Sequence, residues 1–182
     1  MQTPGAGAAP AALPSVTLVL GGARSGKSRH AEALCEAAAA SGTYCATATA
    51  GDAEMAARIA AHRARRGPFW RTIEAPLDLA GAIRDASAPH APLLVDCLTL
   101  WLSNLMLAGR DPEAEAAALE AACAGLAGPV VLVANEVGLG IVPDNALARA
   151  FRDAAGRLNQ RMAARADRVV FVAAGLPLVL KG

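Results

Sequence analysis

The stretch Gly21-Gly-Ala-Arg-Ser-Gly-Lys-Ser28 constrains the fold of this chain more than any other feature of its sequence. It matches the pattern G-x-x-x-x-G-K-[ST] of a phosphate-binding loop, in which glycines let backbone N–H groups surround a polyphosphate. The lysine reaches the terminal phosphates, and the serine hydroxyl ligates Mg²⁺. Such a loop needs a strand before it and a helix after it, and both are indicated, because residues 16–20 are apolar and residues 29–40 are rich in Ala, Leu and Glu. A chance glycine-rich turn is the alternative, but this context favours binding of a nucleoside triphosphate.

Apolar segments alternate with helical segments along the rest of the chain. The predicted strands are residues 16–20, 43–47, 93–97, 130–134, 169–173 and 178–180. The predicted helices are residues 29–40, 52–65, 76–86, 98–108, 112–126 and 144–166, with Asp52, Asp111 and Asp144 as N-caps. Most strands are continuously apolar, as strands covered on both faces are. The order predicts the α/β class: a P-loop NTPase with a mainly parallel sheet, helices on both faces and an antiparallel C-terminal edge strand.

Length and composition bound the domain organisation. The 182 residues suit one domain with a complete core. Residues 1–15 are rich in Gly, Ala and Pro and contain no Lys or Arg, so we expect a disordered extension there and a single catalytic domain over residues 16–182. The formal net charge of +1 argues against nucleic acid or an anionic membrane as a partner.

Cysteine usage and hydropathy indicate the compartment. The four cysteines, Cys35, Cys45, Cys97 and Cys123, are widely spaced and form no C-x-x-C pair. This spacing is typical of reduced, buried thiols rather than of zinc ligands or disulfides. No apolar run approaches the roughly 20 residues that a transmembrane helix needs. We therefore expect a cytoplasmic protein without a membrane span.

A histidine among arginines is the second informative pattern. In the stretch from Asp52 to Trp70, helical geometry puts Arg58, His62, Arg65 and Arg66 at i, i+4, i+7 and i+8 on one face. Guanidinium groups beside an imidazole disfavour its protonated form, and they bind polyphosphates through paired hydrogen bonds. A free imidazole nitrogen beside a phosphate site meets the requirement for attack at phosphorus. The spacing leaves open the alternative of a solvated basic helix with an incidental histidine.

Polar side chains stand at the ends of several predicted strands. Asp96 has the usual position of an Mg²⁺-binding carboxylate downstream of a phosphate loop, although an aspartate at this position also caps helices. Asn135 and Glu136 follow the next strand. Because ligands of open α/β sheets bind beyond the carboxyl ends of the strands, we expect these side chains on the phosphate-loop side. Glu74 fits either a bond to a ribose or base edge or a structural role.

Several other residues favour structural roles. We expect His30 to pack or cap, His90 to lie in a loop, and Trp70 and Trp101 to make core or subunit contacts. A set of arginines near the C-terminus is interpreted as a solvated helix face or an oligomer contact. Its members are Arg149, Arg152, Arg157, Arg161, Arg165 and Arg168.

The assembled stretches resemble the bifunctional adenosylcobinamide kinase/adenosylcobinamide-phosphate guanylyltransferase family of coenzyme B12 assembly. The resemblance extends from about residue 16 to the C-terminus, with the order of the motifs preserved. The residues that carry it are Leu18-Val-Leu-Gly-Gly-Ala-Arg-Ser-Gly-Lys-Ser-Arg29, Tyr44-Cys-Ala-Thr47, Glu54-Met-Ala-Ala-Arg-Ile59 with His62, Trp70-Arg-Thr72 with Glu74, Asn135-Glu-Val-Gly-Leu-Gly-Ile-Val-Pro143, Phe151-Arg-Asp153 and Leu158-Asn-Gln160. This combination is far more specific than the phosphate loop alone.

The resemblance implies two reactions. A phosphoryl group passes from ATP or GTP to the hydroxyl of adenosylcobinamide. GMP then passes from GTP to that phosphate, giving adenosylcobinamide-GDP and pyrophosphate through a guanylylated histidine, for which His62 is the matching position. The resemblance also implies a RecA-like variant of the fold and a homotrimer.

The motifs and the resemblance together predict the residues of the active site. His62 and Lys27 are the predicted catalytic residues, and Ser28 with Asp96 is expected to hold Mg²⁺. The predicted nucleotide-binding residues are Gly21, Gly22, Ala23, Arg24, Ser25, Gly26, Lys27, Ser28, Ala46, Thr47, Ala48, Arg63, Ala64, Arg65, Arg66, Glu74 and Asp96. The alternatives are another small-molecule kinase of the P-loop class, with a structural His62, and a non-catalytic nucleotide-dependent switch.

Overall fold

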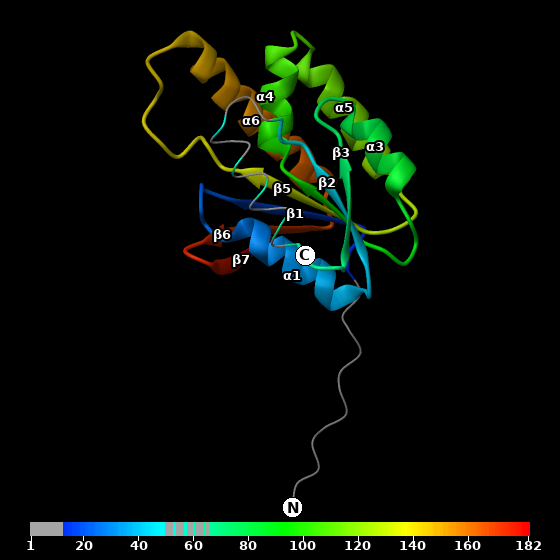
Figure 1. Cartoon of the computed structure of the whole chain (residues 1–182). Helices are drawn as coiled ribbons and strands as arrows, with labels where there is room; N and C mark the ends of the chain where they lie inside the picture. The colour runs from blue at the N-terminus through cyan, green and yellow to red at the C-terminus, as the bar shows by residue number, and fades with distance from the viewer. Residues whose placement is uncertain (1–12, 50–52, 54–56, 58–59, 61–63, 65) are drawn as a thin grey trace, which may run out of the picture.

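The computed structural model describes residues 13–49, 53, 57, 60, 64 and 66–182. Within these residues, a seven-stranded sheet has the order β3-β2-β4-β5-β1-β6-β7 (Figure 1). Its strands are β1 (Val16–Gly21), β2 (Gly42–Ala46), β3 (Trp70–Glu74), β4 (Leu93–Asp96), β5 (Val130–Asn135), β6 (Arg168–Ala173) and β7 (Leu176–Lys181). All neighbouring pairs are parallel except β6 and β7. The predicted α/β sheet with an antiparallel C-terminal edge strand is confirmed.

Helices cover both faces of the sheet (Figure 1). Helix α1 (Lys27–Ala38) lies on one face, while α3 (Leu79–Ala86), α4 (Leu98–Leu107), α5 (Pro112–Cys123) and α6 (Ala146–Arg165) lie on the other. The apolar cluster on the α1 side includes Ala31 and Cys35, and the larger cluster includes Trp101, Leu119 and Leu158. Successive strand side chains alternate between the two clusters, so the central strands need an uninterrupted apolar sequence.

Side-chain caps determine where three helices begin. Asp78 accepts a hydrogen bond from Gly81 N (2.9 Å), so α3 begins later than predicted. Asp111 caps α5 as predicted, accepting from Glu113 N at 2.9 Å. The prediction for α6 was wrong, because Asn145 rather than Asp144 is its N-cap and accepts from Ala148 N at 2.7 Å.

The two edge strands differ most from the sequence prediction. Strand β3 was not predicted, because its sequence Trp-Arg-Thr-Ile-Glu mixes polar and apolar residues and its side chains are half-buried or exposed. Within the described part of the chain it pairs with β2 alone, at the edge of the sheet, so it needs no continuous apolar run. Strand β7 is longer than predicted and exposed along its whole length.

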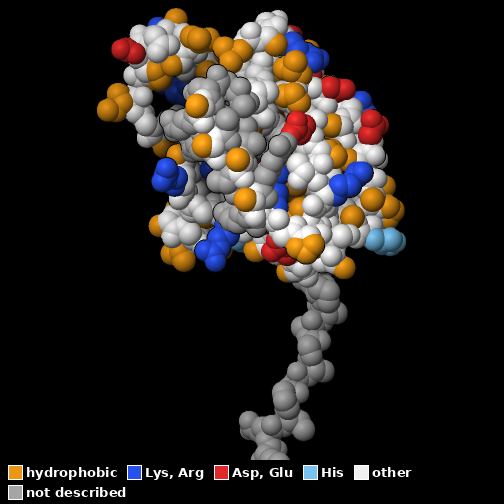
Figure 2. Space-filling view, in the orientation of Figure 1, with side chains coloured by type: hydrophobic (Ala, Val, Ile, Leu, Met, Phe, Trp, Pro, Cys, Tyr) orange, Lys and Arg blue, Asp and Glu red, His pale blue; other side chains and the backbone are white. Residues whose placement is uncertain are grey.

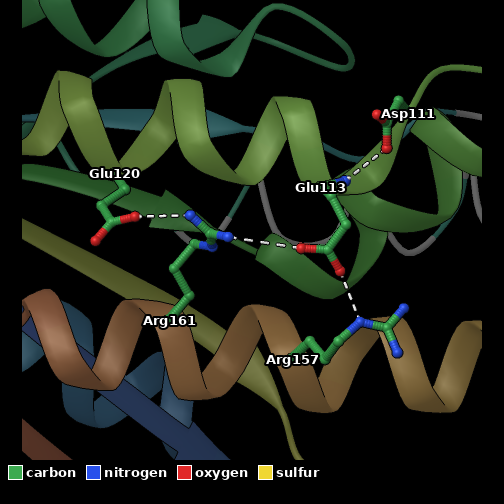
Figure 3. A network of polar contacts seen from close by, with 5 residues as sticks. All are labelled: Asp111, Glu113, Glu120, Arg157 and Arg161. Carbon is green, nitrogen blue, oxygen red and sulfur yellow. Dashed lines mark hydrogen bonds and ion pairs between the residues drawn. The ribbon is translucent and has the colours of Figure 1, made fainter.

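Two arginines of α6, Arg157 and Arg161, form ion pairs with α5 (Figure 3). The Nε of Arg157 lies 2.6 Å from Oε1 of Glu113. Arg161 bridges two carboxylates, at 3.6 Å from Glu113 and 2.9 Å from Glu120. These two arginines therefore have partners within the same chain, where the sequence suggested only a solvated face or an oligomer contact.

The remaining composition-based expectations concern thiols and membrane spans. All four cysteines are buried and free of disulfides. Burial raises the pKa of the Cys35 and Cys45 thiols to about 12. Among the described helices, none has the length and apolar character to cross a membrane. The predicted extension falls mostly outside the described residues, and Ser15 O, at its end, accepts a hydrogen bond from Val130 N (2.9 Å).

Candidate functional site

The phosphate loop lies between β1 and α1, as predicted. Gly21 ends the strand, and a Cβ at this position would lie 2.5 Å from both Ser25 Oγ and Val172 O. Gly26 has φ +96° at the N-cap of α1, a left-handed conformation that side chains rarely adopt. Gly26 has no side chain with which to cap this helix, so within the described residues the first N–H groups of α1 are suited to bind an anion.

Two other loops hold the phosphate loop in place. The N–H of Glu136, after β5, donates to Gly21 O at 3.1 Å, and the N–H of Gly175, in the β6–β7 turn, donates to Ser25 O at 2.8 Å. Lys27 is buried, and its ammonium donates to Gly22 O at 3.2 Å. This lysine lies folded over the loop, where it can meet the terminal phosphates of a nucleotide.

The strand order brings the polar strand ends together. Strand β5 lies between β1 and β4, and its register pairs Asn135 with Gly21 and Val133 with Asp96. The carboxyl ends of these parallel strands therefore meet at one edge of the sheet, as expected for Asp96, Asn135 and Glu136. The backbone N–H of Asn135 donates to Thr99 Oγ1 (2.7 Å), which ties this edge to α4.

Asp96 does not cap a helix, although the sequence allowed that role. Its Oδ2 accepts a hydrogen bond of 2.6 Å from the hydroxyl of Tyr44, a buried residue of the neighbouring strand β2. Burial, reinforced by the Asp96 carboxylate, raises the pKa of Tyr44 above its ordinary range. The hydroxyl thus keeps its proton and orients the carboxylate.

The donor set at this edge suits Mg²⁺. A serine hydroxyl and an aspartate carboxylate are hard oxygen donors, and Mg²⁺ with a nucleotide uses few protein ligands beside phosphate oxygens and water. Within the described part of the chain, no group of three or more His, Cys, Asp or Glu side chains forms a metal site by itself. Ser28, in the first turn of α1, and Asp96 supply oxygen donors of the kind that fits this ion.

The predicted nucleotide-binding residues Ala46 and Glu74 end β2 and β3, the two strands on one side of β4, with Ala46 between Glu74 and Asp96. Ala46 is in register with both Asp96 and Glu74, the last residues of β4 and β3. The side chain of Thr47 is fully buried and fixes the chain after β4: its Oγ1 donates to Cys97 O and accepts from Cys97 N, both at 2.8 Å. Ala48 is half-buried.

The predicted histidine helix is only partly described. His62, Arg63 and Arg65 lie outside the described residues, so their placement and roles remain predictions. Four alanines in this region have helical backbone and are exposed: Ala53, Ala57, Ala60 and Ala64. Arg66 is described, and its guanidinium carbon lies 3.3 Å from the centroid of the Tyr44 ring, with Nη1 3.2 Å from Thr72 Oγ1. This stacking connects the end of the segment to the Asp96 edge.

Three contacts of the site were not predicted from the sequence. Tyr44 appeared only within a motif of the resemblance, and nothing in its spacing pointed to Asp96. The Gly175 contact with the phosphate loop depends on the β6–β7 hairpin. Asn104 of α4 donates from Nδ2 to Thr47 O (2.8 Å) and Pro76 O (3.1 Å). Each contact joins residues that are distant in sequence.

The fold and the loop define a P-loop NTPase with a RecA-like parallel sheet. Solved structures show the same fold: the flagellar accessory protein FlaH of Methanocaldococcus jannaschii has a TM-score of 0.53 and 12% identity, covering 93% of this chain and 80% of that one. The PH0250 protein of Pyrococcus horikoshii has a TM-score of 0.57 and 6% identity, covering 95% of this chain and 89% of that one.

Sequence comparison then identifies the family. Residues 17–180 match the family model described as cobinamide kinase / cobinamide phosphate guanyltransferase, and the chain belongs to this family. The bifunctional adenosylcobalamin biosynthesis protein CobP of Pseudomonas aeruginosa is 52% identical over 91% of this chain and 96% of its own length. The proteins named CobU from Salmonella typhimurium and Escherichia coli are 48% and 44% identical, each over 90% of this chain and 98% of its own length.

Proposed function

We propose that the protein phosphorylates adenosylcobinamide with ATP or GTP and then transfers GMP from GTP to the phosphate, giving adenosylcobinamide-GDP and pyrophosphate. The observation that carries this function is a complete phosphate loop with Asp96 at the same sheet edge, in a chain that belongs to the cobinamide kinase / cobinamide phosphate guanyltransferase family. The substrates are the triphosphate and the corrinoid, and the reactions take place in the cytoplasm, in keeping with four buried thiols.

Each residue of the loop has a role in this proposal. The backbone N–H groups over Gly21–Ser28 bind the phosphates, and Lys27 stabilises charge on the transferred oxygens. Ser28 and Asp96 hold Mg²⁺, which, when bound, neutralises charge on the phosphate oxygens. Tyr44 orients Asp96 through its 2.6 Å hydrogen bond.

His62 is the proposed nucleophile of the second reaction. Its nitrogen attacks the α-phosphorus of GTP, forming a phosphoramidate and releasing pyrophosphate, and the corrinoid phosphate then displaces the histidine. Arg63, Arg65 and Arg66 are proposed to bind the nucleotide, with Ala46, Thr47, Ala48, Ala64 and Glu74 lining its site. The stacking of Arg66 on Tyr44 supports a connection between this segment and the loop.

A homotrimer is part of the proposal. Its support, besides the resemblance, is the exposed edge strand β7, where Leu176, Leu178 and Leu180 are 73%, 60% and 57% exposed. An apolar edge strand of this kind is typically covered by a partner. Sedimentation of the purified chain measures the number of copies.

Mass spectrometry of the intact protein after incubation with GTP tests the covalent step. We expect a GMP adduct in the unaltered chain and none in His62→Ala. Pyrophosphate release measured with and without phosphorylated cobinamide then tests the transfer. An adduct that persists in His62→Ala, or nucleotide-dependent phosphorylation without any pyrophosphate release, contradicts the transferase half of the proposal and leaves a small-molecule kinase.

A further inference from the structure

The loop after β5 begins beside the phosphate loop. Glu136 is the first residue beyond β5, and its N–H donates to Gly21 O at 3.1 Å. Because β5 lies between β1 and β4, Glu136 stands between the phosphate loop and the edge where Asp96 ends its strand. In Figure 1 the loop leaves the sheet at the same edge as the phosphate loop and then extends away from the body of the protein to the start of α6.

The Glu136 carboxylate is held by its own loop. Oε1 accepts a hydrogen bond from Gly138 N at 2.5 Å, and a Cβ at Gly138 would lie 2.8 Å from the same oxygen. The half-buried carboxylate has no ion pair with a lysine or arginine among the described residues. A carboxylate that is held in this way, and that has no ion-pair partner among the described residues, can accept a proton.

The same loop exposes three large apolar side chains. Leu139, Ile141 and Val142 are 83%, 98% and 62% exposed. Figure 2 shows hydrophobic side chains gathered at the upper left of the molecule, over this loop and the start of α6. Apolar side chains clustered on a projecting loop next to a catalytic edge indicate a ligand that covers them.

We infer that this loop is the acceptor side of the kinase site, where Glu136 takes the proton of the acceptor hydroxyl and Leu139, Ile141 and Val142 bind the corrinoid. The inference rests on the proposed function. A corrin macrocycle offers a broad surface to three apolar side chains, and its hydroxyl is on a side arm, which would extend from this loop towards Glu136 and the phosphate loop. The hydroxyl oxygen bonds to the γ-phosphorus, the bond from that phosphorus to the bridging oxygen breaks, and ADP or GDP leaves. The hydroxyl proton passes to Glu136.

Two variants separate the roles of the loop. Glu136→Gln keeps the size of the side chain but removes its capacity to accept a proton, so kcat for phosphorylation falls by roughly 10²–10⁴. Guanylyl transfer to adenosylcobinamide phosphate prepared beforehand stays unchanged, because that step consumes no hydroxyl. Ile141→Ser raises KM for adenosylcobinamide about tenfold, the effect of losing one large apolar contact, and leaves KM for ATP unchanged.

The matched controls are the same types of substitution at positions of the surface outside this loop. Glu113→Gln alters a glutamate of α5, and Leu107→Ser alters an apolar residue that is 79% exposed at the end of α4. Both are expected to keep the kinetic constants of the unaltered chain.

Equal loss of both reactions in Glu136→Gln would mean that this carboxylate is structural and would overturn its role as base. If Ile141→Ser leaves KM unchanged but dissociates the oligomer, a second copy covers the loop instead. An unaltered chain that phosphorylates no cobinamide refutes the proposed function itself, a result distinct from either of these.

Discussion

The hydroxyl of Tyr44 donates a 2.6 Å hydrogen bond to Oδ2 of Asp96. On its other side, the Tyr44 ring is covered by the guanidinium of Arg66 at 3.3 Å and meets Trp70 edge-on, with ring centroids 5.7 Å apart. One buried side chain therefore orients the carboxylate at the end of β4 and also contacts Arg66, the residue that directly follows the predicted histidine helix.

Tyr44→Phe tests this orientation, because it removes the hydroxyl and keeps the ring that Arg66 covers. Partners that orient a metal-binding side chain typically change metal affinity by 10–100-fold. We expect the Mg²⁺ concentration for half-maximal activity to rise roughly tenfold. The increase in melting temperature given by Mg²⁺ with a nucleotide analogue should shrink in parallel.

Trp70→Phe is the control, because it alters the same aromatic cluster without touching Asp96. Its Mg²⁺ dependence should equal that of the unaltered chain. If both variants shift the Mg²⁺ dependence equally, general loosening of the cluster explains the effect and the hydroxyl has no special role.

Two glycines of the phosphate loop offer a matched pair. Gly26 has φ +96°, and a Cβ there would lie 3.2 Å from Gly175 Cα, whereas a Cβ at Gly22 would meet nothing within 4 Å. Left-handed backbone costs a residue with a side chain about 1–2 kcal/mol. Gly26→Ala should therefore weaken nucleotide binding by roughly 5- to 30-fold, measured by titration calorimetry. Gly22→Ala should keep the affinity, and an equal loss in both variants would contradict the role of the left-handed conformation.

Most of the fold could be predicted from the sequence, because most strands and helices are marked by residue patterns within their own segment. Strands β1, β4 and β5 are buried on both faces, so their apolar runs are continuous and appear directly in the sequence. Strand β3 lies at the sheet edge with exposed side chains, which left no such run to detect. Its strand conformation depends on pairing with β2, a contact between distant parts of the chain.

The sequence predicted those parts of the candidate site whose residues are neighbours in the chain or stand at the end of a strand. The phosphate loop lies between its strand and helix, and Asp96 lies at the edge where a parallel sheet places strand ends. The bond from Tyr44 to Asp96 and the contact of Gly175 with Ser25 depend on strand order and on a hairpin. Neither leaves a spacing pattern in the sequence, so neither was predicted.

The ion pairs between α5 and α6 should contribute little to stability (Figure 3). Arg161 is 35% exposed, and its carboxylate partners Glu113 and Glu120 are 49% and 39% exposed, so water and salt screen each pair. Exposed pairs typically contribute about 0.2–1 kcal/mol. We expect Arg161→Met to lower the free energy of unfolding by less than about 1 kcal/mol at low salt and by less still in 1 M NaCl. A double-mutant cycle with Glu120→Gln isolates the pair, and a coupling energy well above this range would show that the network is structurally essential.

The stability of the protein should fall in mild acid because of His30. Its side chain is half-buried on α1, and its Nε2 has no hydrogen-bond partner among the described residues. Burial, followed by the nearby charge of Arg168, lowers the pKa of His30. The unfolded chain protonates this histidine near its ordinary pKa of about 6.5, so below that pH it binds more protons than the folded chain. The free energy of unfolding therefore decreases as the pH falls below about 6.5 towards the lower folded-state pKa.

Urea unfolding of the full chain between pH 7.5 and pH 5 measures this dependence. His30→Gln removes the titrating group, so its stability should change less over that range than the stability of the unaltered chain. His90→Gln is the matched control, because His90 is exposed in a turn and its replacement should leave the pH dependence intact. If His30→Gln loses as much stability between pH 7.5 and pH 5 as the unaltered chain does, other groups cause the acid sensitivity, because this variant has no imidazole at position 30 to bind a proton.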